Sequence, residues 1–585
     1  MGSNQSLGRL QERRRSVAVT GAALVARIVP DVSGIDKHFD YLVPPEMADR
    51  IVIGSMVRIS LHGRRIGGWV IHLGGSDELL IASDRLVPIA KWSSIGPPEA
   101  IVQLAGWAAA RWGSAHVAAV LRSASPATNI VRTPPGRRQV HTPQQPAELA
   151  VQRLSPNTDP LPFVIDFIRR GPTLILHPSV RACRAVAGRL RRQGYSVALM
   201  PDDWAAAAGG VDVVVGGRSA VWAPCPDLRA VVVLDEHDEG YQEQRSPTWH
   251  ARDVAIERAS RARASCLLIS PAPSLAALHW APIQRRLPLA DERAGWPQVT
   301  CVDRSDVEPW KRSLLSSELI EALRSTRRVA CIINRPGRSR LSACRACRAI
   351  QRCERCQAAV SQASDHRFVC ERCATDRPLV CQVCGSGAMA NVKPGVSRLR
   401  EELEAAAARP VGEVVGDSTE LAAVDVYVGT EALLHRVRNI DVVAFLDFDA
   451  ELLAPRYRAG EQAMALLVRA ARLVGPRQLG GTVMVQTTVP DHPVLTAAVL
   501  SDPGRFSDAE SIVRRELGLP PYAALASVDG EGAAAFVESA GLQAAGSADS
   551  VLVRTPSWDD LGPALSATAR PKGSRLKVRV DPPRR

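Results

Sequence analysis

The 585-residue sequence contains no hydrophobic run of the roughly 18 residues that a helical membrane span requires. It also contains little lysine: six of its 73 basic residues are lysine, and the others are arginine. None of the six lysines follows a glycine, so the chain lacks the Gly-Lys pair through which a P-loop reaches the β- and γ-phosphates of a nucleotide. These absences argue against a protein with membrane-spanning helices and against an ordinary P-loop nucleotide hydrolase.

The overall charge favours a polyanionic partner. The formal net charge is +13 and the pI is near 9.4, as in many proteins that bind nucleic acid. A solvated basic surface without such a partner is the alternative. The apolar fraction of 46% is sufficient for packed cores, and a chain of this length predicts about four domains. We expect the protein to be cytosolic.

Local patterns divide the chain into successive segments. After a polar tail at 1–15, short β-branched runs over 16–97 predict a small β-rich domain; 98–150 combines a helical stretch (98–122) with a Pro-, Gln- and Arg-rich linker. Buried strands alternate with helices over 151–290, and again over 291–340 and 387–515, which predicts two parallel α/β lobes. A cysteine-rich module (341–386) interrupts the second lobe, and a small α+β domain (516–585) ends the chain. The predicted fold class is multidomain α/β.

The strongest local signal is a set of four C-x-x-C pairs. They hold eight of the 13 cysteines: Cys344/Cys347, Cys353/Cys356, Cys370/Cys373 and Cys381/Cys384. Two such pairs supply the four thiolates of a structural tetrahedral zinc site, so the set predicts two Zn²⁺ ions. A disulfide array is the alternative, but disulfides are rare in cytosolic proteins. We expect a nested arrangement, with the first pair sharing a metal with the last, although the spacing also allows neighbouring pairs to combine.

A predicted buried strand ends in acidic residues at VVVLDEHDEGY, residues 231–241. Such acids hold Mg²⁺ and orient a water in nucleotide hydrolases, provided that a glycine-rich loop binds the phosphates. The segment at the corresponding loop position reads RLSPNTDPLPF, in which three prolines offer no N–H donor. We therefore expect Asp235 and Glu236 to be structural, accepting hydrogen bonds from nearby loops or from Arg252.

Several longer motifs resemble one protein family. VVVGGRSAVWAP, VLDEHDEGYQEQ and WHARDVA, followed by a split α/β lobe with four C-x-x-C pairs, resemble the PriA replication-restart family (primosomal protein N′) of superfamily 2 DNA helicases. The resemblance runs over nearly the whole chain, from FDYLVP to VDP. It implies a β-rich DNA-binding domain, two RecA-like helicase-type lobes, a two-zinc module inserted in the second lobe and a small C-terminal domain.

The helicase motifs of that family are eroded in this sequence. The family's DEEH box is shortened to Asp235-Glu236-His237, which we interpret as a degenerate Walker B-like remnant. The two arginines of the family's last motif fall on Leu473 and Pro476. The resemblance therefore implies a degenerate member, of the kind seen in actinobacteria, that has lost ATPase and helicase activity.

The family's pocket for the 3′ end of DNA resembles the segment Phe39-Asp40-Tyr41. In that pocket Asp40 would accept the 3′-hydroxyl, and the two aromatic rings would flank the terminal nucleotide. The resemblance also implies partners and a location. These are forked or single-stranded DNA, primosome proteins, the machinery that loads the replicative helicase, and single-stranded DNA-binding protein, in the cytoplasm at the nucleoid.

Three functions are consistent with the sequence. The first is a replication-restart protein that binds forked DNA and helps to reload the replication machinery without hydrolysing ATP. The second is an ATP-dependent 3′→5′ DNA helicase with an unrecognised nucleotide site. The third is a zinc-dependent interaction protein with no role at DNA.

Overall fold

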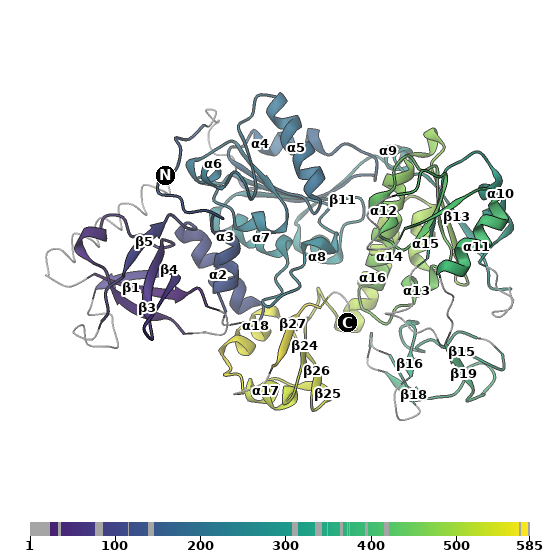
Figure 1. Ribbon diagram of the computed structural model, residues 1–585. Helices are drawn as coiled ribbons and strands as arrows, with labels where there is room; N and C mark the ends of the chain where they lie inside the picture. Colours follow the sequence, from purple (N-terminus) through teal and green to yellow (C-terminus); the bar gives the residue numbers. More distant parts are fainter. Residues whose placement is uncertain are drawn as a thin grey trace. The chain divides into compact units, whose positions relative to one another are not determined.

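The computed structural model describes residues 24–32, 37–75, 86–114, 116–137, 146–306, 314–333, 342–347, 349–362, 367–370, 372–373, 375–391, 396–414, 421–571 and 575–582. The predicted tail at 1–15 lies outside these residues. The described chain divides into two compact units (Figure 1). Unit 1 takes in the described residues of Met1–Ala150, Pro160–Ile269 and Ala523–Asp581; unit 2 takes in those of Val151–Asp159, Ser270–Tyr522 and Pro582–Arg585. Each unit is therefore built from segments that are far apart in the sequence.

The N-terminal part of unit 1 is a five-stranded antiparallel sheet with the strand order β2-β1-β4-β3-β5. Its strands are β1 (Leu24–Pro30), β2 (Phe39–Leu42), β3 (Met56–Leu61), β4 (Arg64–Gly75) and β5 (Lys91–Ser94), with a short 3₁₀ helix η1 (Pro45–Met47) after β2. Successive side chains of a strand point to opposite faces, and one face of this sheet buries Ile28, Val57, Ile59 and Val70. The sheet confirms the predicted β-rich domain.

Two helices follow the sheet, where the sequence predicted one helical stretch over 98–122. Helix α2 (Glu99–Arg111) is followed by Gly113, which has a φ of 62°, and helix α3 (Ala118–Ala124) begins after it. A left-handed residue interrupts the helical hydrogen-bond ladder, and glycine adopts this conformation without steric cost. The apolar spacing was therefore correctly recognised as helical, but the break at Gly113 was missed.

The strands of lobe 1 that lie in unit 1 are parallel and follow the order β11-β10-β7-β9-β8. Its strands are β7 (Thr173–Leu176), β8 (Val197–Leu199), β9 (Val213–Gly216), β10 (Ala230–Leu234) and β11 (Ser265–Ser270). Its helices are α4 (Leu161–Ile168), α5 (Val180–Arg192), α6 (Trp204–Gly209) and α7 (Ala251–Ala262), with 3₁₀ turns η4 (Arg218–Trp222) and η5 (Glu239–Tyr241). All five residues of β10 are buried, as expected for a parallel strand covered on both faces.

Lobe 2, in unit 2, is a second parallel sheet with the order β13-β23-β22-β14-β21-β20. Its strands are β13 (Gln298–Asp303), β14 (Val329–Ile332), β20 (Val411–Val414), β21 (Val426–Gly429), β22 (Val442–Phe445) and β23 (Thr482–Thr487). Unit 2 also contains α8 (Leu275–Trp280), β12 (Ile283–Arg286), α9 (Leu289–Ala294), α10 (Ser317–Arg324), α11 (Val396–Ala407), α12 (Leu433–Arg436), α13 (Asp449–Leu452), α14 (Ala459–Val474), η6 (Arg477–Leu479), α15 (Pro493–Val499) and α16 (Pro503–Glu516).

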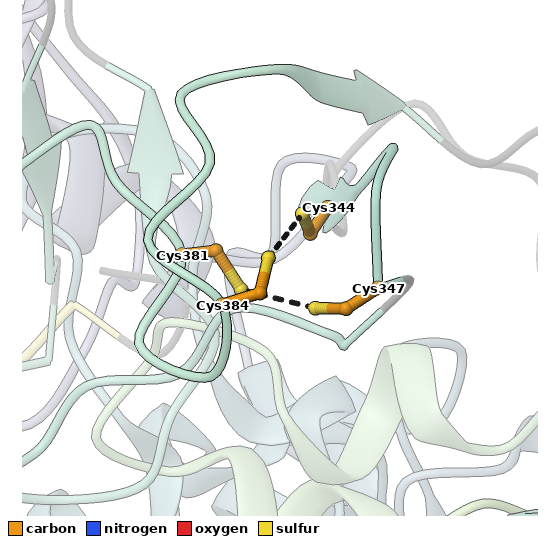
Figure 2. Close-up of side chains that lie close together, drawn as sticks. All are labelled: Cys344, Cys347, Cys381 and Cys384. Carbon is orange, nitrogen blue, oxygen red and sulfur yellow. Dashed lines mark hydrogen bonds between the residues drawn. The ribbon is translucent and has the colours of Figure 1, made fainter.

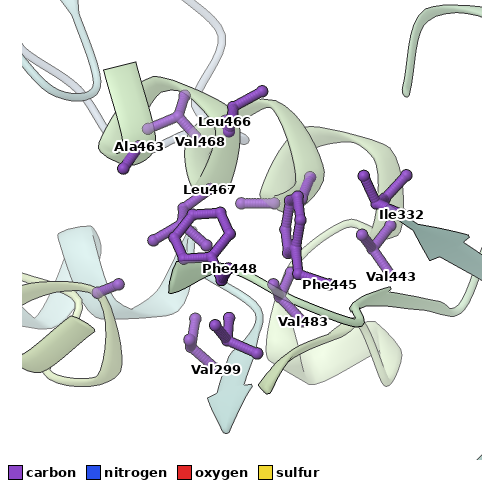
Figure 3. Close-up of a cluster of buried hydrophobic side chains, with 14 of the residues drawn as sticks. Val299, Ile332, Val443, Phe445, Phe448, Ala463, Leu466, Leu467, Val468 and Val483 are labelled. Atoms are coloured by element: carbon purple, nitrogen blue, oxygen red, sulfur yellow. The ribbon is translucent and has the colours of Figure 1, made fainter. Parts of the chain in front are cut away.

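The largest part of the lobe 2 core is built around two phenylalanines. The rings of Phe445, at the end of β22, and Phe448 have centroids 4.8 Å apart. Figure 3 shows them among Leu467 of α14 and Val483 of β23. Both rings are almost completely buried, so β22, β23 and α14 share one core. The two sheets confirm the predicted pair of parallel α/β lobes.

The C-terminal domain, part of unit 1, is a four-stranded antiparallel sheet with the order β25-β26-β24-β27. Its elements are β24 (Ala524–Asp529), α17 (Ala533–Ser539), β25 (Ala544–Ser547), β26 (Ser550–Thr555), α18 (Trp558–Ala567) and β27 (Lys577–Val580). Gly562 lets α18 approach α2 closely, because a Cβ at this position would lie 2.5 Å from the carbonyl oxygen of Arg111. In the described part of the chain, no helix combines the length and apolarity needed to cross a bilayer.

Candidate metal centres and nucleic-acid interface

The first and last C-x-x-C pairs form one cluster, here called the outer cluster (Cys344, Cys347, Cys381 and Cys384). Cys344 ends β15 (Ser342–Cys344), which pairs with β19 (Met389–Asn391), so the two ends of the module lie side by side. The Sγ atoms of Cys344 and Cys384 are 3.5 Å apart, and those of Cys347 and Cys381 are 3.4 Å apart (Figure 2). All four sulfur atoms lie within 4.8 Å of one another.

The two middle pairs form the inner cluster (Cys353, Cys356, Cys370 and Cys373). Their closest Sγ pairs are 3.4 Å and 3.5 Å apart, and again all four atoms lie within 4.8 Å of one another. Fully buried Phe368 packs against them from β17 (Arg367–Val369), the middle strand of a small sheet with β16 (Ser361–Gln362) and β18 (Asp376–Pro378). The predicted nested arrangement is therefore confirmed.

The C-x-x-C loops turn tightly through their own backbone hydrogen bonds. The Cys353 N–H donates to the Ala358 carbonyl at 2.7 Å, and the Cys381 N–H donates to the Ser386 carbonyl at 2.9 Å. Gln357 and Gly385, each four residues after the first cysteine of its pair, adopt positive φ values of 59° and 73°. These turns point both thiols of a pair toward the same spot.

The donor sets fit a tetrahedral metal ion such as zinc. Zn–S bonds of about 2.3 Å place the sulfurs of such a site about 3.8 Å apart, close to the spacing here, whereas a disulfide would require about 2.05 Å. A backbone hydrogen bond from Cys347 lowers the pKa of the Cys344 thiol to about 6; the Cys356 thiol lowers the pKa of Cys370 to about 5, and Cys370 raises the pKa of Cys356 in return. Thiolates are the form that binds metal. A closed set of four leaves no coordination position for substrate, so such ions would stabilise the fold.

A buried polar pair connects the two clusters. The Gln351 side-chain amide donates to Cys381 Sγ at 3.3 Å, and its oxygen accepts a hydrogen bond of 3.1 Å from Arg377. Arg377 in turn lies over the ring of Phe368, 4.7 Å from its centroid. Gln351 is 1% exposed, so its hydrogen bonds are shielded from water. Sequence reasoning missed both residues, because a lone glutamine or arginine between cysteine pairs carries no recognisable signal.

The inner cluster is joined to lobe 2 itself. The Ala359 N–H donates to the Leu453 carbonyl at 2.6 Å, next to α13. Arg372, inside the third C-x-x-C pair, forms a 2.7 Å ion pair with Glu510 of α16. Glu510 also binds the buried Arg514, 3.0 Å away. The module is thus anchored to the lobe by backbone and charged groups.

The acids after β10 lie where a nucleotide hydrolase would hold its metal, but they have internal partners. Glu236 is fully buried, and its Oε2 is 3.4 Å from the guanidinium of Arg252 on α7, which confirms the expected hydrogen bond. Arg252 also binds Asp253 at 2.8 Å. Burial raises the pKa of Asp253, but the cations around it, Arg252 first, hold that pKa at about 2.

The two neighbours of Glu236 occupy the same turn. Asp235 has a positive φ of 53° and lies 3.6 Å from the Nε2 atom of His177. His237 is half-buried. Acids that act on nucleotides need access to Mg²⁺ and water, and the glutamate of this turn has none.

The segment in the position of the phosphate loop, after β6 (Leu149–Arg153), is bound within unit 2. Arg472 of α14 donates to the Pro156 carbonyl at 3.1 Å. The Asn157 amide donates to the carbonyls of Gly295 and Ala471 at 3.0 and 3.2 Å. These polar groups therefore bind the protein itself. Leu473, at the position of a family arginine, packs against the lobe 2 core.

The Phe39-Asp40-Tyr41 segment forms most of β2. Arg27 of β1 holds the Asp40 carboxylate through two hydrogen bonds of 2.8 and 3.0 Å. Tyr41 is 4% exposed and donates to the Ser60 carbonyl at 2.8 Å, and Phe39 is partly buried against the same core. The alternation of a strand places these rings on the face opposite to Asp40. This differs from the expectation that both rings flank a nucleotide bound at Asp40.

Two parallel α/β lobes, an inserted module with two clusters of four thiols and a β-rich N-terminal domain define a multidomain α/β protein. The family model described as the PriA 3′DNA-binding domain (3′BD) matches residues 27–126, which include α2 and α3. The probable replication restart protein PriA of Mycobacterium tuberculosis (strain ATCC 25618 / H37Rv) is 30% identical over 570 residues, which cover 85% of each chain. The chain therefore belongs to the PriA replication restart protein family.

One further relative matches a smaller part of the chain. The replication restart protein PriA of Bacillus subtilis (strain 168) is 27% identical over 346 residues, which cover 54% of this chain. That match spans only 43% of the B. subtilis protein. Among solved structures, S. cerevisiae Dbp5 bound to RNA and ADP BeF3 gives a TM-score of 0.34 at 12% identity, covering 64% of this chain and 90% of Dbp5.

Proposed function

We propose that this protein acts in replication restart by binding forked DNA and helping to reload the replication machinery, without hydrolysing ATP. The observation that carries the loss of ATPase activity is the burial of Glu236 against Arg252. A glutamate enclosed in this way does not reach a water or a metal ion. The bound segment around Pro156 and Asn157 supports the same conclusion, because its polar groups are occupied by the protein.

The DNA contacts of the proposal begin at Asp40. An ionised carboxylate has about four acceptor positions, so Asp40 can accept a 3′-hydroxyl while it remains bound to Arg27. Arg27 is about one-third exposed, and its charge suits a neighbouring phosphate. In this proposal the edge of the Phe39 ring contacts the terminal nucleotide. Buried Tyr41 stabilises the strand through its hydrogen bond to the Ser60 carbonyl.

Each cluster of the cysteine module is proposed to hold one Zn²⁺ as a structural ion. The remaining partners follow from family membership: single-stranded DNA-binding protein, primosome proteins and the loading machinery of the replicative helicase. The expected location is the cytoplasm, at the nucleoid.

The test of the proposed function combines binding and turnover. Fluorescence anisotropy should show tighter binding to forks with a free leading-strand 3′-hydroxyl than to forks with a blocked end. Asp40→Ala should remove about 1.4 kcal/mol of that preference, or about tenfold, because one charge-assisted hydrogen bond is lost. Asp49→Ala, which removes an exposed acid of the same domain, is the matched control and should retain the preference.

In the same preparation, ATP hydrolysis should stay at background with and without forked DNA. DNA-stimulated turnover that Glu236→Gln abolishes would establish the helicase alternative. Failure to bind any DNA, at low as well as moderate salt, would favour an interaction protein with no role at DNA.

A further inference from the structure

Helix α5 (Val180–Arg192) is the most one-sidedly charged helix of lobe 1. It contains five arginines and no acidic residue in 13 positions. Its inner face consists of Cys183, Ala187 and Leu190, which are buried and recur at helical spacing. The helix packs with this face on β8 and β9. The arginines are therefore not needed to hold the helix on the sheet.

Three of these arginines form a stripe on the outer face, opposite the buried one. Arg181, Arg184 and Arg192 are exposed, and Gly188 lies between them on the same stripe. Positions separated by three or four residues are neighbours on a helix surface. Within the described part of the chain, none of the three side chains forms a hydrogen bond or ion pair, whereas Arg191 beside them binds Asp203 at 3.2 Å.

We propose that this α5 stripe is a second DNA contact, which binds the phosphate backbone of duplex DNA. The inference rests on the proposed DNA-binding function and names a surface for it beyond the 3′-end pocket. At 1.5 Å per residue the stripe from Arg181 to Arg192 is about 16.5 Å long. Duplex DNA of that length carries about ten phosphate charges. Each guanidinium can bind a phosphate with two parallel hydrogen bonds.

The small residues of the stripe favour close approach of a backbone. Gly188 has no Cβ, and Ala185 beside it is exposed, so no large side chain protrudes from the surface between the arginines. A surface that binds a protein partner usually has an apolar centre with aromatic residues. The only large apolar side chain exposed on α5 is Val180, at its first position. Since phosphates carry no sequence information, the contact should be independent of DNA sequence.

The experiment measures binding of a blunt 25-base-pair duplex, labelled at one end, over a range of salt concentrations. The triple variant R181Q/R184Q/R192Q should bind at least tenfold more weakly near 0.1 M salt. The slope of its log Kd plotted against log salt concentration should be smaller by about 2 to 3, since each lost phosphate contact removes about 0.9 from that slope. The matched control R132Q/R263Q/R575Q removes the same net charge from three exposed, scattered arginines of unit 1 and should behave like wild type.

A conservative variant and a test of folding separate loss of phosphate contacts from loss of structure. The conservative variant R181K/R184K/R192K should recover most of the affinity, and circular dichroism should show that all variants fold. Equal weakening by both glutamine triples would overturn the proposal, because net charge alone would then account for binding. Unchanged duplex binding in the α5 triple would also overturn it, and loss of poly-glutamate binding in that triple would instead identify an acidic protein partner. If wild type binds forks in either case, the proposed function still stands; if wild type binds no DNA, both fail.

Discussion

Glu236 shows, for a single residue, how a fully buried acid at a strand end is accommodated in the fold. A buried carboxylate is stable only when its charge is paired or hydrogen-bonded. Arg252 supplies that partner here and is itself balanced by Asp253. Glu236 therefore contributes to the charge balance of the interior.

Replacing Glu236 with glutamine should lower stability rather than activity. Glu236→Gln keeps the shape but leaves buried Arg252 with one carboxylate, so we expect a loss of about 1–3 kcal/mol. Melting followed by circular dichroism should shift downward by several degrees. Glu538→Gln, which removes an exposed acid of unit 1, should leave the melting temperature unchanged. Equal melting temperatures of the two variants would mean that the ion pair between Glu236 and Arg252 does not stabilise the fold.

For individual elements, the sequence predicted best where burial is complete. The alternation over 151–290 was recognised because parallel strands covered on both faces, such as β7, β9, β10 and β11, read as continuous apolar runs. Strand β20 (Val411–Val414) gives a weaker signal, because its VGEV sequence mixes a glycine and a glutamate into a short edge strand. The break between α2 and α3 was missed because apolar spacing continues across Gly113, whose effect depends on its backbone conformation.

The two thiol clusters were predicted down to their cysteines for a chemical reason. Four thiolates in two pairs are almost diagnostic of a structural metal site, and spacing alone identifies the pairs. The order in which they combine depends on strand pairing, here between β15 and β19, which short segments do not reveal in a sequence. The connection through Gln351 and Arg377 exists only once both clusters have formed. The burial of Tyr41, similarly, depends on which face of β2 meets the core.

Gln351 should determine how firmly the outer cluster holds its ion. Its N–H···S hydrogen bond stabilises negative charge on Cys381, and loss of such supporting groups weakens metal binding by about 10–100-fold. Gln351→Leu should therefore accelerate zinc transfer from the outer cluster to a metallochromic chelator, leaving the inner cluster unaffected. Gln362→Leu, at an exposed position of β16, is the matched control. Faster loss of both ions to the same degree would contradict a role confined to one site.

In the whole molecule, the contacts that define the units cross long stretches of sequence. Unit 1 joins the N-terminal domain, lobe 1 and the C-terminal domain, with α18 packed on α2 through Gly562. Unit 2 joins lobe 2, the cysteine module and the segment that follows β6. Such pairings are set by small residues and buried ion pairs, which look ordinary in a sequence. They also imply that the metals should matter to one unit and not to the other.

Removal of zinc should destabilise unit 2 in two stages. The outer cluster exposes Cys347 and Cys384, whereas three of the four inner thiols are buried, so a chelator should remove the outer ion first. We expect this first loss to leave lobe 2 intact, because the inner cluster provides the contacts to Leu453 and Glu510. Loss of the second ion should then open the neighbourhood of α13 and α16, since metal-binding energy in such modules is folding energy.

Hydrogen exchange followed by mass spectrometry, with zinc release recorded in parallel under reducing conditions, resolves the two stages. About two ions per chain should be released in separate phases, and protection in α13 and α16 should fall only with the second. The sheet of lobe 1 serves as the internal reference, because it belongs to unit 1 whereas the module belongs to unit 2, and its protection should not change. Release of both ions in one phase, with protection of α16 unchanged, would show that the ions are dispensable for lobe 2. The charged and backbone links through Arg372 and Ala359 would then hold the module in place by themselves.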